Sequence, residues 1–168
     1  NANKILNNHN VKTAKLDCEL LLSEVINKDR QYLILNSQKI LKEKQINIFD
    51  HFIERRKKGE PIAYLINKKD FWKETFYVDR NVLIPRPDTE HLVEETLKLS
   101  KNNSKLHILD IGTGSGCILL SILNERKTFY GTGIDISQKA INVAKYNAKL
   151  LNINNRVKFY NSDVDKFL

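Results

Sequence analysis

Apolar and polar positions in the second half of the chain alternate between short apolar runs and longer amphipathic stretches. The apolar runs at 106–111, 129–136 and 157–160 have the length and composition of buried strands. Between them, the apolar stretch 118–123 and the periodic stretch 137–151, with Ser137 as its N-cap, predict two helices. Strands that alternate with helices in this way predict an α/β fold with a doubly wound parallel sheet.

The first 60 residues follow a helical pattern instead. Helical spacing predicts a helix over 13–27 with Thr13 as its N-cap, and a short helix or turn over 29–35. A third helix is predicted to begin at Ser37 and to end in the basic run 55–58, where cations complement the helix dipole before Gly59 stops the helix. The inward-facing residues of the two longer helices would be Ala14, Cys18, Leu21, Leu22, Val25, Ile26, Ile40, Leu41, Ile48, Phe49, Phe52 and Ile53. We therefore expect a small helical bundle, in which the basic run has an ordinary structural role.

A connector joins these two regions. Two short strands, 70–72 and 75–78, predict a hairpin, and 81–85 is expected to be extended because residues before proline avoid the helical region. Asp88 is then expected to cap a helix over 88–101. The sequence thus predicts a helical domain at 1–65, a hairpin connector at 66–84 and the first part of a doubly wound domain at 85–168.

A glycine loop follows the first predicted strand of the sheet. Glycines at 112, 114 and 116 let the backbone turn sharply and approach a ligand closely. The loop lacks the lysine of a phosphate loop, and Cys117 stands where a dinucleotide fingerprint has glycine or alanine. The spacing, counted from Asp110, instead resembles motif I of class I S-adenosylmethionine (SAM) methyltransferases. Asp135 lies about 20 residues further on, at the end of the second strand, where a carboxylate suits ribose hydroxyls. The alternative is a glycine turn in an unrelated α/β protein, with Asp135 capping a helix.

Composition adds limits on location and partners. The net charge of +8 fits proximity to nucleic acid or the ribosome, but the lysines are scattered, and the Lys-, Asn- and Ile-rich composition that an AT-rich genome produces is the favoured explanation. No apolar run approaches the ~20 residues that span a bilayer, and no signal-peptide core is present. Cys18 and Cys117 lie far apart without metal-ligand spacing, so we expect free thiols in a reducing cytoplasm and no metal site. The start of the chain, without methionine, suggests a trimmed fragment.

Three strings carry a more specific resemblance. They are Arg55–Leu65 (Arg-Arg-Lys-Lys-Gly-Glu-Pro-Ile-Ala-Tyr-Leu), Val82–Glu90 (Val-Leu-Ile-Pro-Arg-Pro-Asp-Thr-Glu) and Asp110–Ile118 (Asp-Ile-Gly-Thr-Gly-Ser-Gly-Cys-Ile). In order and spacing they resemble the bacterial release-factor glutamine methyltransferases, the HemK/PrmC family. Asp17–Leu22 is similar to the first-helix signature of that family's N-terminal domain. The resemblance covers nearly the whole chain, and the Ile-Pro-Arg-Pro-Asp-Thr-Glu string is more specific than the glycine loop.

The resemblance implies an activity and a set of roles. Members of the family transfer a methyl group from SAM to the side-chain amide nitrogen (N5) of the glutamine in the Gly-Gly-Gln motif of class 1 peptide chain release factors. Their helical domain helps bind the release factor. Arg86, Thr89 and Glu90 belong to the signature, and the resemblance suggests no chemistry for them beyond helix capping and domain packing. By position, the cofactor-binding residues would be Gly112, Thr113, Gly114, Ser115 and Gly116 at the methionine part, Asp135 at the ribose, and Asp163 and Val164 at the adenine, where relatives often have an aromatic residue in place of Val164.

The family's Asn-Pro-Pro-Tyr motif, which would supply acceptors for the target nitrogen, is absent. The prolines are Pro61, Pro85 and Pro87, so we expect no catalytic residue in this chain. We expect the 168 residues alone to be inactive, with weak SAM affinity, poor solubility and an unpaired sheet edge. Two other functions stay open: a nucleic-acid amino methyltransferase acting on tRNA, rRNA or DNA, including a second activity in a domain fused beyond residue 168, and a non-enzymatic SAM-fold binding module.

Overall fold

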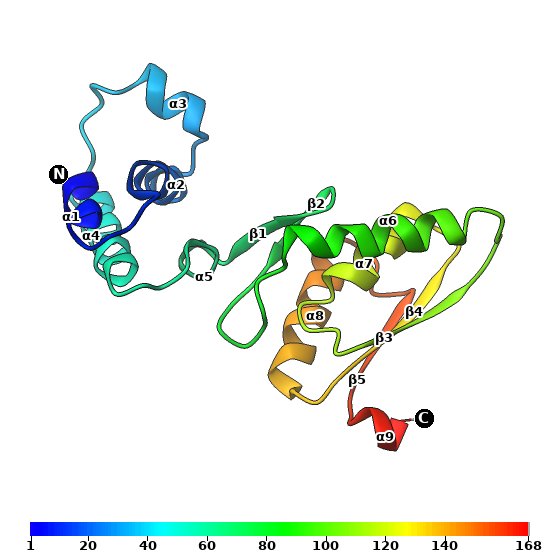
Figure 1. Ribbon diagram of the computed structural model, residues 1–168. Helices are drawn as coiled ribbons and strands as arrows, with labels where there is room; N and C mark the ends of the chain where they lie inside the picture. The colour runs from blue at the N-terminus through cyan, green and yellow to red at the C-terminus, as the bar shows by residue number, and fades with distance from the viewer. Residues whose placement is uncertain (168) are drawn as a thin grey trace. The chain divides into compact units, whose positions relative to one another are not determined.

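The computed structural model describes residues 1–167, and the chain divides into two compact units. The first unit is Asn1–Ile66, and the second begins at Asn67. The predicted connector therefore falls almost entirely in the unit that also contains the sheet (Figure 1).

The first unit is helical. Its elements are α1 (Ala2–Asn8), α2 (Ala14–Ile26), α3 (Arg30–Leu35), α4 (Glu43–Lys57) and α5 (Ile62–Ile66). Its core combines Leu6, Ala14, Leu21, Ile53 and Leu65, so each of these helices except α3 contributes a buried side chain. The predicted helical bundle is thus confirmed.

The helix starts of this unit agree with the predictions for α2 and α3 but not for α4. Asp29 caps α3 by accepting the N–H of Tyr32 (2.7 Å), and Thr13 is the N-cap residue of α2 but makes no side-chain capping bond. The prediction of a helix from Ser37 was wrong, because α4 begins only at Glu43. The side chain of Gln45 accepts the N–H of Lys42 (3.0 Å), which fixes that start.

The inward-facing set of α4 was correct in part. Ile53 is buried, and Phe49 and Phe52 pack against the same core. Ile40 is 90% exposed and Ile48 is 40% exposed, which contradicts the prediction for both. Ile40 precedes α4, so the helical periodicity that predicted an inward position for Ile40 does not apply to it.

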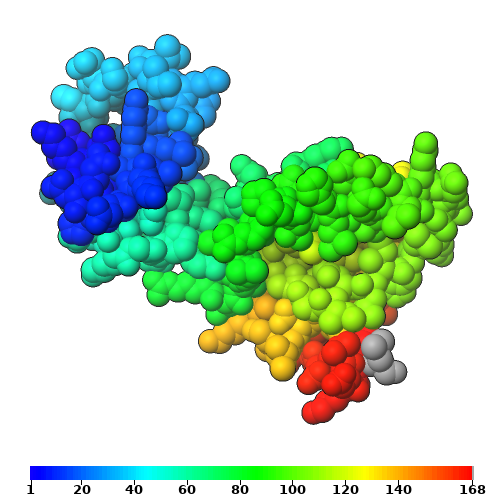
Figure 2. All heavy atoms as spheres, in the orientation of Figure 1, coloured from blue at the N-terminus to red at the C-terminus, as the bar shows by residue number. Residues whose placement is uncertain are grey.

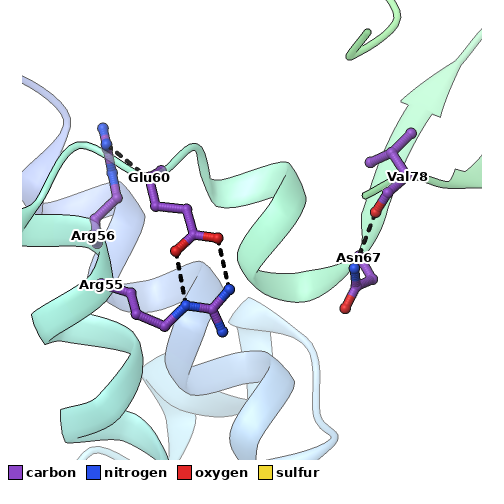
Figure 3. Close-up of polar contacts among 5 residues, drawn as sticks. All are labelled: Arg55, Arg56, Glu60, Asn67 and Val78. Carbon is purple, nitrogen blue, oxygen red and sulfur yellow. Dashed lines mark hydrogen bonds and ion pairs between the residues drawn. The ribbon is translucent and has the colours of Figure 1, made fainter. Parts of the chain in front are cut away.

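The basic run at the end of α4 has the predicted structural role. Arg55 forms a two-pronged ion pair with Glu60 (2.8 and 2.6 Å), and Arg56 donates to the carbonyl of Glu60 (3.2 Å; Figure 3). Arg56 also pairs with the buried carboxylate of Asp17 at 2.7 Å, joining α4 to α2. Gly59 follows with φ +89°. These arginines are therefore engaged within the bundle.

The second unit begins with a hairpin and continues as an α/β layer. Its elements are β1 (Lys68–Phe71), β2 (Glu74–Tyr77), a 3₁₀ turn η1 (Pro87–Thr89), α6 (Glu90–Leu99), β3 (His107–Ile111), α7 (Cys117–Glu125), β4 (Tyr130–Asp135), α8 (Gln138–Leu150), β5 (Val157–Asn161) and α9 (Val164–Phe167). The hairpin is confirmed, and Asn67 closes its open end by donating to the carbonyl of Val78 (3.1 Å; Figure 3). The helix expected at 88–101 instead starts as a 3₁₀ turn, and Thr89 rather than Asp88 is the N-cap residue of α6.

The sheet is parallel with order β3-β4-β5, as the alternating pattern predicted (Figure 1). Ile108 faces the core under α7, where a Cβ on its neighbour Gly131 would meet Leu119. Leu109 and Ile111 point to the other face and remain 40% and 54% exposed. The prediction of a buried strand at 106–111 therefore holds for one face of β3 only. Ser137 caps α8 as expected, accepting the N–H of Ala140 (3.2 Å).

Candidate functional site

The predicted cofactor residues gather at the carboxyl ends of the three parallel strands. The glycine loop 112–116 joins β3 to α7, Asp135 ends β4, and Asp163 and Val164 follow β5. In an open parallel sheet, this edge is where ligands bind. The structure therefore brings together every residue that the sequence indicated for the cofactor.

The loop is a fixed turn. Gly112, Gly114 and Gly116 have φ values of +72°, +56° and +81°, a region that other residues enter only with strain. The N–H groups of Gly112 and Thr113 both donate to the carbonyl of Ile134 in β4 (2.9 Å each). The loop is thereby anchored on the neighbouring strand.

Asp135 connects the loop to the start of α8. Its Oδ2 accepts the N–H of Gly114 (2.9 Å), and its Oδ1 accepts the N–H of Ser137 (2.9 Å). The carboxylate is thus held in one orientation, and it is only half-buried. Because each carboxylate oxygen has a second lone pair, both oxygens keep acceptor capacity for a pair of hydroxyl groups.

Asp110 of β3 contacts the loop through the side chain of Thr113. Its Oδ2 accepts the hydroxyl of Thr113 (2.7 Å). Burial raises the pKa of Asp110, the charge of Asp135 raises it further, and the hydrogen bond from Thr113 acts in the opposite direction. Asp110 is therefore a half-buried carboxyl group that positions Thr113, a role additional to its place in the motif spacing.

The end of β5 is tied to the end of β4. The amide of Asn161 donates to the carbonyls of Asp135 (3.0 Å) and Ile136 (2.8 Å), and the N–H of Ser162 donates to the carbonyl of Asp135 (3.1 Å). Asp163 follows as an exposed residue and Val164 as a half-buried one. These bonds hold the end of β5, from which Asp163 and Val164 continue, against the end of β4.

Two asparagines of this region were missed by sequence reasoning. Asn161 makes the bonds just described, and Asn147 of α8 donates to the carbonyl of Ser115 within the loop (2.8 Å). The available signal was the position of Asn147 on the apolar stripe of its helix, between Ala144 and Ala148, where a polar side chain must find partners.

Cys117 is not equipped as a nucleophile. It is 8% exposed, and burial raises the pKa of its thiol to about 11. The thiol is therefore neutral at physiological pH. Both cysteines of the chain are free, as predicted.

The signature string 84–90 has a packing role at Glu90. Its Oε1 accepts the N–H of Trp72 in the hairpin turn (2.9 Å), where Trp72 has φ +57°. Arg86 is exposed, and its carbonyl accepts the N–H of Thr89 (3.1 Å). Within residues 1–167, no three His, Cys, Asp or Glu side chains gather as metal ligands, and no helix is long and apolar enough to cross a membrane.

Comparison with known proteins matches both parts of the chain. Residues 1–66 match a family model described as the PrmC N-terminal domain, and residues 102–168 match one described as a methyltransferase domain.

Curated relatives match across both parts. The release factor glutamine methyltransferase of Buchnera aphidicola subsp. Acyrthosiphon pisum (strain APS) is 44% identical over 91% of this chain and 54% of its own length. That of Aliivibrio fischeri (strain ATCC 700601 / ES114) is 42% identical over 84% of this chain and 49% of its own length. A bifunctional methyltransferase of Rickettsia prowazekii (strain Madrid E) is 36% identical over 97% of this chain and 35% of its own length.

The chain spans about half the length of the release factor glutamine methyltransferases it matches. The matched segment includes both domains, so the identity with these relatives extends over the helical domain and the methyltransferase domain. The chain therefore contains a domain of the PrmC N-terminal family followed by a methyltransferase domain, and most of its length is similar to release factor glutamine methyltransferases.

Proposed function

We propose that the protein carrying this chain transfers a methyl group from SAM to the side-chain amide nitrogen of the glutamine in the Gly-Gly-Gln motif of class 1 release factors. The observation that carries the proposal is the hydrogen bond between Gly114 and Asp135 (2.9 Å), which joins the glycine loop to the carboxylate expected to bind ribose. The relatives of this chain that are named release factor glutamine methyltransferases support the choice of substrate.

The cofactor site would divide by chemistry. Loop residues 112–116 would bind the methionine part, where glycine lets the backbone approach a ligand closely. Asp135 would accept the two ribose hydroxyls with the lone pairs that its backbone donors leave open. Asp163 and Val164 would lie beside the adenine, with Val164 giving apolar contact in place of the aromatic stacking found in relatives.

The reaction sets requirements that these residues meet in part. An amide nitrogen is a weak nucleophile because its lone pair is delocalised into the carbonyl, so it must be aligned with the sulfonium methyl and relieved of a proton. SAM supplies the electrophilic methyl, and the fixed loop would orient it. The family's Asn-Pro-Pro-Tyr motif, which would hold the amide, does not occur in the 168 residues. We therefore assign cofactor positioning, and no catalytic residue, to this chain.

The helical unit offers a surface for the release factor. A cavity of about 670 Å³ lies among α2, α3 and α4, and its rim includes the exposed Ile34 and Ile40. Figure 2 shows the atoms of α3 and the segment after it, in light blue, at the top of this unit in that view. The charged side chains that line the cavity are Lys15, Lys28, Lys39 and Glu19, and Glu19 is already paired with Arg30 (2.6 Å). An acidic, partly apolar segment of the partner would fit this groove.

Transfer of radiolabelled methyl groups tests the proposal. The full-length protein is incubated with labelled SAM and a purified release factor, and in parallel with bulk tRNA. We expect label in the release factor, lost when its Gly-Gly-Gln glutamine is replaced and reduced when Asp135 is changed to alanine. Label in tRNA alone would instead support the nucleic-acid candidate, which the net charge of +8 favours. A methyltransferase of release factors would act in the cytoplasm, close to the ribosome.

A further inference from the structure

Asn147 is the most buried polar side chain next to the glycine loop and makes contacts that the cofactor site does not account for. It is 0% exposed and lies in α8 between Ala144 and Ala148. Its Oδ1 accepts the N–H of Tyr77 (2.8 Å), while its Nδ2 donates to the carbonyl of Tyr77 (3.0 Å) and to that of Ser115 (2.8 Å). One amide group of α8 thus contacts both the hairpin and the loop.

These three bonds use both N–H donors of the amide and one of the two lone pairs of its oxygen. A carboxamide has two N–H donors, and each of them meets one carbonyl, while its oxygen meets an N–H. Toward β2 the amide pairs with both backbone groups of Tyr77, as a residue of a neighbouring strand would. The ring of Tyr77 also packs edge-on against Tyr146, the residue before Asn147, at 4.9 Å between ring centroids.

Toward the loop, Asn147 fixes one peptide plane. The peptide that joins Ser115 to Gly116 has its carbonyl held by Asn147 and its N–H held by the carbonyl of Thr113 (2.8 Å). Glycine at 116, with φ +81°, would allow this peptide to turn over at low cost if one of the two bonds were missing. Asn147 therefore holds this peptide in the orientation that the structure shows.

We propose that Asn147 is a positioning residue that sets the conformation of the SAM-binding loop and couples it to the hairpin of residues 68–77. The inference rests on the proposed function, since it concerns the loop assigned to SAM. It predicts that SAM affinity depends on the hairpin contact, although no hairpin residue is assigned to the cofactor site. Binding of SAM to the loop would therefore stabilise the hydrogen bonds between Asn147 and Tyr77 of the hairpin.

Isothermal titration calorimetry, with SAM added to the full-length protein or to its Asn147→Asp variant, tests the coupling between the glycine loop and the hairpin. Aspartate keeps the acceptor for the N–H of Tyr77 but places an oxygen against the carbonyls of Tyr77 and Ser115. We expect the Kd for SAM to rise about tenfold or more at a temperature where circular dichroism shows the variant folded. Asn142→Asp, an exposed change of the same kind on the same helix, should leave the Kd within about twofold.

A folded Asn147→Asp variant with unchanged SAM affinity would overturn the inference while leaving the proposed function intact. Failure of the unaltered protein to bind SAM would instead reject the proposed function. Hydrogen exchange on the unaltered protein covers the case in which the variant does not fold. SAM should slow exchange of the Tyr77 amide, and equal exchange with and without SAM would contradict the coupling.

Discussion

Gly133 and Gly112 lie near the candidate cofactor site and are needed there for different physical reasons. A Cβ on Gly133 would lie 2.6 Å from the ring of Phe159 and 2.9 Å from the hydroxyl of Thr113. A Cβ on Gly112 would meet nothing within 4 Å, but φ is +72° there. The first position is limited by space and the second by backbone strain.

Alanine substitutions separate these two limits. We expect Gly133→Ala to lower the free energy of unfolding by about 1–3 kcal/mol through overpacking and to displace Thr113 from Asp110. Gly112→Ala should cost about 1–2 kcal/mol through strain alone. Urea unfolding measures both, and shortening Phe159 to leucine should relieve Gly133→Ala but not Gly112→Ala. Equal rescue of both variants would contradict this account.

Asp110 gives the stability of the second unit a defined pH dependence. Burial raises its pKa above the ordinary value of 3.8, so the folded state binds this proton more tightly than the unfolded chain does. Its contribution to stability is therefore present at acid pH and is lost as the pH rises through the unfolded and then the folded pKa. Asp110→Asn, which keeps an acceptor for Thr113, should raise the free energy of unfolding relative to the unaltered protein at pH 7 and not at pH 3. Urea titrations at the two pH values measure this difference. A gain of the same size at both would show that the charge of Asp110 is not its cause.

At the scale of elements, the hairpin turn depends on a side chain from α6. The N–H of Trp72, a residue at φ +57°, donates to Glu90, and its indole N–H donates to Glu125 of α7 (2.9 Å). Glu90→Ala would leave the N–H of Trp72 without this acceptor, and we expect a loss of about 1–3 kcal/mol in unfolding free energy. Glu90→Gln keeps an acceptor oxygen and should recover most of that loss. If both substitutions cost the same, the charge of Glu90 rather than its hydrogen bond would matter.

The elements that the sequence predicted well are those determined by local signals. Ser137 caps α8, and the glycine spacing places the loop correctly after β3, because both depend on residues within a few positions of each other. α1 and α5 were not predicted, since the burial of Leu6 and Leu65 comes from packing against α2 and α4 rather than from their own short sequences. The same reason hides Asn147, whose partners lie 70 and 32 residues away.

At the scale of the whole chain, the sheet face that carries Leu109 and Ile111 is open. A polypeptide of these 168 residues, expressed alone, is expected to transfer no methyl groups and to self-associate, because it lacks the Asn-Pro-Pro-Tyr motif and exposes this apolar face. Methyl-transfer assays and light scattering measure the two properties. Transfer above background by this polypeptide would show that the acceptors for the amide come from residues within it.

The lysines of the cavity among α2, α3 and α4 allow a test of whether the two units bind different substrates. If the helical unit recognises the release factor and the sheet holds SAM, charge reversal in the groove should affect one substrate only. Lys28 and Lys39 both lie over the ring of Tyr32, at 5.7 and 5.3 Å from its centroid, and line the cavity among α2, α3 and α4. We expect Lys28→Glu/Lys39→Glu in the full-length protein to raise the KM for the release factor about tenfold and to leave the Kd for SAM within about twofold.

A matched control separates the groove from overall charge. Lys4→Glu/Lys12→Glu makes the same change in net charge within the same unit but outside this cavity, so it should leave both constants near their original values. An equal rise in KM for the two double variants would mean that general electrostatic attraction, not the groove, brings the release factor to the enzyme. A rise confined to the groove variant would assign recognition to the surface formed by α2, α3 and α4, and cofactor binding to the carboxyl edge of the sheet.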